Sequence, residues 1–136
     1  MTVPDDSLPT AVDATAIDRF LAEERTLIEP RAQATDVAGV LAGGGLVVDI
    51  RPVDLRDKDG LIPGALVVGR NVLEWRLDPT SPWKLPEVTG ADQQVVLFCD
   101  EGYASSLAAA TLVRLGLARA TDLDGGFQAW RRAQGA

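Results

Sequence analysis

Short apolar runs alternate with stretches of helical spacing along most of this chain. The runs at 46–50 and 95–98 are almost wholly apolar and rich in β-branched residues, which is typical of buried central strands. We expect strands at 26–29, 46–50, 65–68, 95–98 and 118–123, and helices at 14–25, 31–42, 72–77, 105–115 and 126–133. This alternation predicts an α/β fold in which a parallel sheet has helices on both faces.

The beginning of the chain is expected to stand apart from the rest. Residues 1–11 contain two prolines and little apolar content, and we expect a flexible lead-in there. We therefore divide the chain into an N-terminal part, residues 1–26, and one domain, residues 27–136. A chain of this length is expected to form a single domain.

The helix expected at 14–25 has one apolar face. The sequence from Thr15 to Asp18 fits a capping box at its start. We expect its apolar face to pack beside the main domain as a plain cover. The residues of this face are Ile17, Phe20 and Leu21.

Regular structure is less clearly marked between the third and fourth expected strands. The short helix at 72–77 carries Trp75, which we expect in the core because aromatic side chains mainly contribute buried area. Three prolines interrupt residues 78–89, which predicts an irregular connection. The polar stretch at 52–60 is expected to be a solvated loop or a short helix.

Cys99, the single cysteine, stands between the strand at 95–98 and the helix at 105–115. The unpaired N–H groups and the dipole of a helix N-terminus stabilise an anion. Thiols at such positions have pKa values lowered to about 3.5–7.5, from about 8.5 when free. The position therefore favours a reactive thiolate, and the other interpretation is a small buried hydrophobic side chain.

The composition limits the chemistry available to Cys99. Because the chain has no histidine, it can form neither a Ser-His-Asp or Cys-His arrangement nor a His-ligated zinc site. One cysteine excludes both a cysteine metal cluster and an internal disulfide. Any reaction at Cys99 must therefore rely on the backbone and the helix dipole to stabilise the sulfur anion. We expect no metal and no organic cofactor.

The net charge and the hydropathy pattern disfavour several classes of binding partner. The formal net charge of −7 disfavours binding to nucleic acid or to an anionic membrane, which requires a basic surface. No apolar run approaches 18 residues, and the first residues lack the basic and apolar segments of a secretory signal. With one cysteine, a reducing cytoplasm is the expected location. The oligomeric state stays open.

Four stretches in order, within roughly 27–133, make the chain resemble the rhodanese family. They are 47–52, similar to a strand ending in Asp-x-Arg; 60–65, similar to Gly-His-Ile-Pro-Gly-Ala; 99–105, similar to the active-site loop; and 123–130, similar to Leu-x-Gly-Gly-x-x-x-Trp. Leu61 stands where the family usually has histidine. The resemblance implies a five-stranded parallel sheet with helices on both faces, here with an N-terminal helix added.

The resemblance also implies a sulfurtransferase. Cys99 would take a sulfane sulfur from a donor, form a persulfide, and pass the sulfur to a thiol or another nucleophilic acceptor. The donor would be a small molecule or a protein. Backbone amides of residues 100–105 would hold the charge of the terminal sulfur. The residues expected to bind the substrate are Asp100, Glu101, Gly102, Tyr103, Ala104, Ser105 and Arg51.

Two of these side chains have a structural alternative. Ser105 can cap the following helix or donate to the sulfur, and we expect capping. Arg51 can bind substrate or hold loops together, and both interpretations stay open. Asp49 is expected to brace its loop by accepting backbone N–H groups.

The loop departs from the family pattern in its charge. Ala104 occupies the sixth loop position, where members acting on thiosulfate often have arginine, and Asp100 and Glu101 would repel a dianion. We therefore expect weak activity with thiosulfate and a persulfide donor instead. A related Cys-x5-Arg phosphatase is disfavoured, because Ser105 stands in place of its arginine. The remaining alternative is a non-catalytic module that senses redox state or binds a partner.

Overall fold

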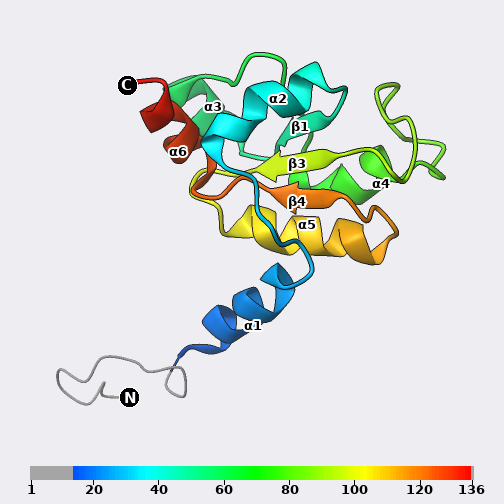
Figure 1. Ribbon diagram of the computed structural model, residues 1–136, viewed down its shortest axis with the longest axis horizontal. Coiled ribbons are helices and arrows are strands. Elements are labelled where there is room, and N and C mark those ends of the chain that lie inside the picture. The colour runs from blue at the N-terminus through cyan, green and yellow to red at the C-terminus, as the bar shows by residue number, and fades with distance from the viewer. Residues whose placement is uncertain (1–13, 136) are drawn as a thin grey trace.

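The computed structural model describes residues 14–135, so the lead-in expected at 1–11 lies outside the described residues. The elements, in chain order (Figure 1), are α1 (Ala16–Arg25), η1 (Ala34–Asp36), α2 (Val37–Ala42), β1 (Leu46–Asp49), α3 (Val53–Asp59), β2 (Leu66–Val67), η2 (Arg70–Val72), α4 (Leu73–Leu77), β3 (Val95–Phe98), α5 (Ala104–Arg114), β4 (Ala120–Asp122) and α6 (Gly126–Ala133). The predicted alternation of strands and helices is confirmed.

The described residues form a four-stranded parallel sheet in the order β2-β1-β3-β4, and the predicted number of five strands is wrong. The strand expected at 26–29 is missing because the N–H groups of residues 26–28 donate to carbonyls three residues earlier and continue α1 as turns. Pro30 has no N–H to donate to a ladder. A single bridge between Ala32 and Leu123 remains beside β4.

Successive side chains of β1 and β3 enter two separate cores, as expected for a sheet covered on both faces. One core joins the sheet to α4 and α5, and its members include Leu46, Val48, Val95, Leu97, Leu73, Leu77, Ala108 and Leu112. The other joins the sheet to α2 and α6, and its members include Val47, Val96, Phe98, Val37, Val40 and Phe127. Figure 1 shows α2 and α5 on opposite sides of the strands.

Trp75 does not lie in the core, so that prediction is wrong. Leu73 and Leu77 are four residues apart and turn one face of α4 into the core, which places Trp75 on the opposite face. Its side chain is 58% exposed and lines a surface cavity of about 420 Å³ together with Leu115.

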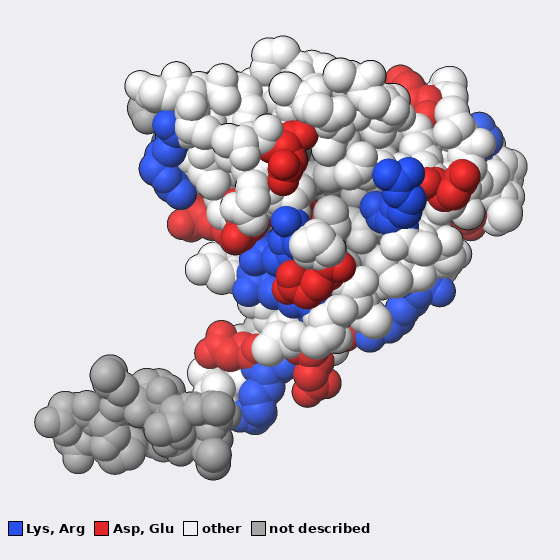
Figure 2. All heavy atoms as spheres, in the orientation of Figure 1, with Lys and Arg blue, Asp and Glu red and all other residues white. Residues whose placement is uncertain are grey.

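The surface of the protein carries both signs of charge. Acidic and basic side chains are interspersed over the face shown in Figure 2. Within residues 14–135, no helix combines the length and the apolar character needed to cross a bilayer.

Helix α1 differs from the predicted apolar cover. Thr15 caps it as expected, because its side chain accepts from the Asp18 N–H. Ile17 and Phe20, however, are 57% and 48% exposed. Figure 1 shows α1 outside the layers, near α5 and projecting away from the body. Leu21 is partly buried, and the residue of α1 that is buried is Glu24, so an ion pair attaches this helix more than the predicted apolar face does.

Candidate active site

Cys99 lies between the end of β3 and the start of α5, as predicted from the sequence. Its side chain is partly exposed. The sulfur accepts two backbone hydrogen bonds, from the N–H of Gly102 at 3.2 Å and from the N–H of Ser105 at 3.4 Å. The loop thus curls around the sulfur and directs positive dipole ends at it, which is the geometry that stabilises a sulfur anion.

Gly102 is required for this curl. Its φ is +91°, in the region that favours glycine. A Cβ at this position would lie 2.9 Å from the nitrogen of Gly125 and 3.2 Å from the carbonyl oxygen of Leu123. Both the backbone conformation and the available space therefore demand glycine here.

Ser105 contacts the sulfur and does not cap the helix, so the expectation of capping is wrong. It lies inside the first turn of α5, where its N–H and its hydroxyl both face the loop. The Cys99 thiol donates to Ser105 Oγ at 3.2 Å. The hydroxyl in turn donates to Asp122 Oδ2 at 2.7 Å. Asp122 comes from the end of β4 and is completely buried.

The buried carboxylate of Asp122 is fully paired. Besides Ser105, it accepts from Ser106 Oγ at 2.8 Å and from Arg31, whose Nε lies 2.8 Å from Oδ1. Burial acts to lower the pKa of Arg31, but hydrogen bonds and the charge of Asp122, with smaller contributions from Asp124 and Glu29, raise it overall. Arg31 therefore stays charged and neutralises Asp122 behind the loop.

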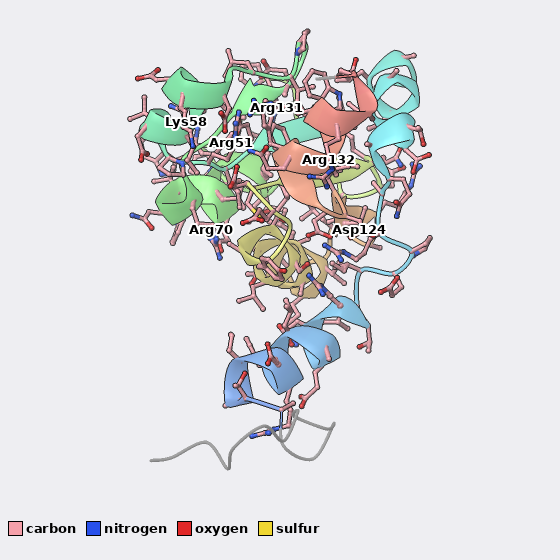
Figure 3. The ribbon with its side chains drawn as sticks, turned by 90° about the vertical axis from the view of Figure 1, so that its left-hand side faces the viewer. Arg51, Lys58, Arg70, Asp124, Arg131 and Arg132 are labelled. Carbon is pink, nitrogen blue, oxygen red and sulfur yellow. The ribbon has the colours of Figure 1, made fainter. Side chains whose placement is uncertain are left out.

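A cavity of about 340 Å³ opens over Cys99. Its wall combines apolar side chains, two arginines and the acidic loop; the lining residues are Ile50, Arg51, Pro52, Leu55, Arg70, Cys99, Asp100, Glu101, Tyr103 and Ala104. Figure 3 labels both arginines, with Arg51 lying toward α3 and Arg70 toward α4. The sulfur is thus accessible to a small molecule or to a side chain of another protein.

Arg51 is buried and is held to the end of β1, two residues before it, and to the Gly60 loop. Its guanidinium forms an ion pair with Asp49, at 2.7 Å between Nη2 and Oδ2, and donates to the Gly60 carbonyl at 2.7 Å. It also lies over the Phe127 ring, at 3.9 Å from the centroid. Asp49 accepts the Arg51 backbone N–H at 2.9 Å, which confirms its expected role as a brace. A role of Arg51 in binding substrate stays a prediction.

The two acidic residues of the loop have different surroundings. Asp100 accepts from Gln128 of α6 at 2.9 Å, while Glu101 is exposed. The arginines of the cavity are already paired, Arg51 with Asp49 and Arg70 with Glu74, whose Oε2 lies 2.9 Å from Arg70 Nη1. The cavity therefore has an acidic rim, and the two arginines in its wall already form ion pairs with carboxylates.

Several residues of this site were missed from the sequence. Arg70 lines the cavity, and Arg31 and Asp122 lie behind the sulfur. Asp122 had a usable signal, because it lies one residue before the end of a predicted strand, and the carboxyl ends of neighbouring parallel strands meet at one edge of the sheet. Arg31 and Arg70 had no comparable local signal. Within residues 14–135, no cluster of three His, Cys, Asp or Glu side chains is placed to hold a metal.

Comparison with known proteins gives one family and several similar structures. The model of the rhodanese-like domain matches residues 33–133. A protein of unknown function from Rhodopseudomonas palustris, RPA3614, described as a possible tyrosine phosphatase, is 33% identical; the alignment covers 94% of this chain and 97% of that one, with a TM-score of 0.77. None of the curated proteins matches the chain.

Two sulfurtransferase structures are also similar. The human single-domain sulfurtransferase TSTD1 is 24% identical over 76% of this chain and 96% of its own, with a TM-score of 0.64. A thiosulfate sulfurtransferase from Pseudomonas aeruginosa is 26% identical over 76% of this chain and 18% of its own, with a TM-score of 0.59.

Proposed function

This chain belongs to the rhodanese-like domain family, and from that membership we propose that it is a sulfurtransferase that carries a sulfane sulfur on Cys99. The observation that carries the proposal is the position of Cys99 Sγ. It lies under an open cavity and within hydrogen-bond distance of the Gly102 and Ser105 N–H groups. Those donors can hold negative charge on sulfur without a histidine base.

The proposed reaction has two displacement steps. In the first, the Cys99 thiolate attacks the outer sulfur of a donor persulfide; the new S–S bond forms as the donor's own S–S bond breaks, and the donor leaves as a thiolate with the electron pair. In the second, an acceptor thiolate attacks the terminal sulfur and Cys99 leaves as a thiolate. No external oxidant or reductant is consumed. A reducing compartment such as the cytoplasm would keep Cys99 in the form that this cycle needs.

We propose that the donor is a low-molecular-weight persulfide or the persulfide of a partner protein, rather than thiosulfate. Asp100 and Glu101 at the cavity would repel a dianion. Arg51 and Arg70 already have carboxylate partners, Asp49 and Glu74, which reduce the positive charge that a dianion would meet in the cavity. The largely apolar remainder of the wall suits a donor with a carbon skeleton.

A phosphatase activity has weaker support. The similar protein RPA3614 is described as a possible tyrosine phosphatase. In this chain, the position six residues after Cys99 is Ser105, whose hydroxyl is engaged with Asp122. A serine lacks the bidentate guanidinium that clamps phosphoryl oxygens, so we favour sulfur transfer.

Mass spectrometry of the intact protein tests the proposal. After incubation with a sulfane donor, Cys99 should gain about 32 Da, the mass of one sulfur, and lose it on mild reduction, which a two-oxygen adduct of nearly equal mass would not do. The Cys99→Ser variant should gain nothing. An unmodified Cys99 in the wild type would instead favour the non-catalytic module, a redox-sensing thiol or partner-binding domain.

A further inference from the structure

Helix α1 lies outside residues 33–133, which the family model matches, yet it is attached to the element that begins at the catalytic loop. Glu24 is buried and forms a two-fold ion pair with Arg114 of α5, in which Arg114 Nη2 lies 2.7 Å from Glu24 Oε2. The apolar residues Ile17 and Phe20 stay exposed. The attachment is therefore polar, and polar contacts fix geometry more narrowly than an apolar patch does.

The next residue of α1, Arg25, reaches the loop itself. Its Nη2 donates to the carbonyl oxygen of Gly102 at 2.8 Å, and its Nε donates to Ser106 Oγ at 3.0 Å. The guanidinium also lies over the ring of Tyr103, 5.8 Å from the centroid. One side chain of α1 thus contacts the middle of the loop, its rim and the first turn of α5.

Gly102 connects these contacts to the sulfur. Its carbonyl oxygen accepts from two guanidinium groups, Arg25 at 2.8 Å and Arg31 Nη2 at 2.9 Å, while its N–H donates to Cys99 Sγ at 3.2 Å. The carbonyl belongs to the peptide unit after Gly102 and the N–H to the unit before it, and glycine is the most flexible joint between two such units. By holding the carbonyl, the two arginines restrict rotation at this joint, and they also bring positive charge to the loop.

We infer that Arg25 is a positioning residue for Cys99, and that α1 is a working part of the active site rather than a cover. Arg25 acts through Gly102: it holds the carbonyl so that the N–H stays aimed at the sulfur, and its charge favours the thiolate. The inference rests on the proposed function only for the identity of the reacting atom. Neither Arg25 nor Arg31 lies within the residues that the family model matches.

The pH dependence of Cys99 alkylation by iodoacetamide tests this inference without sulfur chemistry. Arg25→Gln should move the midpoint of the alkylation profile upward by about one pH unit, a tenfold loss of thiolate at pH values below it. Arg25→Lys keeps a cation but loses the forked donor, and its midpoint should fall between the two. A thermal melt of each variant shows that it is folded at the assay temperature.

Arg19→Gln is the matched control, since Arg19 is on the same helix and donates to the Ala14 carbonyl instead of the loop. Its profile should equal that of the wild type. Wild-type midpoints in folded Arg25→Gln and Arg25→Lys would overturn the inference. If the midpoint moves but Cys99 never accepts sulfur from a donor, the positioning role stands and the proposed transferase activity fails.

Discussion

Ser105 donates its hydroxyl proton to Asp122 at 2.7 Å while the same oxygen lies 3.2 Å from Cys99 Sγ. A hydroxyl has one proton, so in this arrangement Ser105 can accept from the thiol but must turn away from Asp122 to donate to a thiolate. The buried carboxylate and the sulfur therefore compete for one proton. Arg31 and Ser106 remain as partners of Asp122 when Ser105 turns.

Replacing Ser105 should separate the two roles of its hydroxyl. Ser105→Ala removes the contact with the sulfur and should lower kcat/KM for persulfide transfer by about tenfold, the effect of one lost hydrogen bond to a charged group. Stopped-flow transfer assays measure this. Ser106→Ala also removes a bond to Asp122, together with the acceptor of Arg25 Nε, but no contact with the sulfur, so its rate should fall by less. Equal losses of rate in the two variants would contradict the assigned role.

Arg31 has two carboxylate partners, and we expect that neutralising each of them lowers the free energy of unfolding by a different amount. Asp122 is fully buried, and Asp122→Asn should lower the free energy of unfolding by about 3 kcal/mol because it leaves Arg31 without its buried counter-charge. Asp124 has a side chain that is 50% exposed, and Asp124→Asn should cost less than about 1 kcal/mol. Urea denaturation of both variants measures the difference, and similar values would show that Asp122 is not the anchor.

Neutralising the loop should change which donor is used. Two like charges about 6 Å apart repel by about 3 kcal/mol at an effective dielectric constant of about 20, and solvent at Glu101 reduces this. The double variant Asp100→Asn and Glu101→Gln should therefore raise kcat/KM for thiosulfate by about tenfold, with little change for an uncharged persulfide donor. A thiosulfate assay at low ionic strength tests this. Efficient turnover of thiosulfate by the wild type would refute the proposed donor preference.

The ion pair of Glu24 predicts an acid-sensitive attachment of α1. The hydrogen bonds from Arg114 lower the pKa of Glu24, opposed by burial and aided by the Arg114 charge. Because the folded pKa is below the unfolded value of about 4.3, the stabilisation is present above that pH and is lost as the pH falls through the folded value. The stability difference between wild type and Glu24→Gln should thus be constant above about pH 5 and shrink below it.

Denaturation curves of both proteins at several pH values measure this difference directly. The other carboxylates titrate alike in the two proteins, so their effects cancel in the comparison. A difference that stayed constant down to pH 3 or so would mean that Glu24 is not held ionised by Arg114.

The local pattern of hydrophobic and polar residues predicted an element correctly where that pattern is compatible with only one kind of element. The run at 95–98 is fully apolar, and two of its four residues are β-branched; β3 has the predicted bounds. The stretch at 26–29 failed because its apolar character has another cause: Ile28 is buried in the core from a turn and needs no strand partner. Trp75 failed similarly, since a five-residue helix has one inward face and Leu73 and Leu77 occupy it.

The arginines that lie behind the sulfur could not be identified from the local sequence. Arg25 and Arg31 meet Gly102 across 77 and 71 residues of sequence, and nothing near either arginine marks it as different from other surface cations. Their contacts depend on where α1 and the bridge at Ala32 lie beside α5 and β4. Such placements follow from the three-dimensional fold and not from periodicity.

The polar attachment of α1 has a consequence for how this domain could acquire new reactivity. Among the described residues, neither hydrophobic core includes a member of α1. The two cores on the faces of the sheet therefore do not depend on α1, while the inferred positioning of Cys99 runs through one arginine that α1 carries. A segment outside both cores can in this way set the surroundings of a reactive atom that the cores alone hold in place.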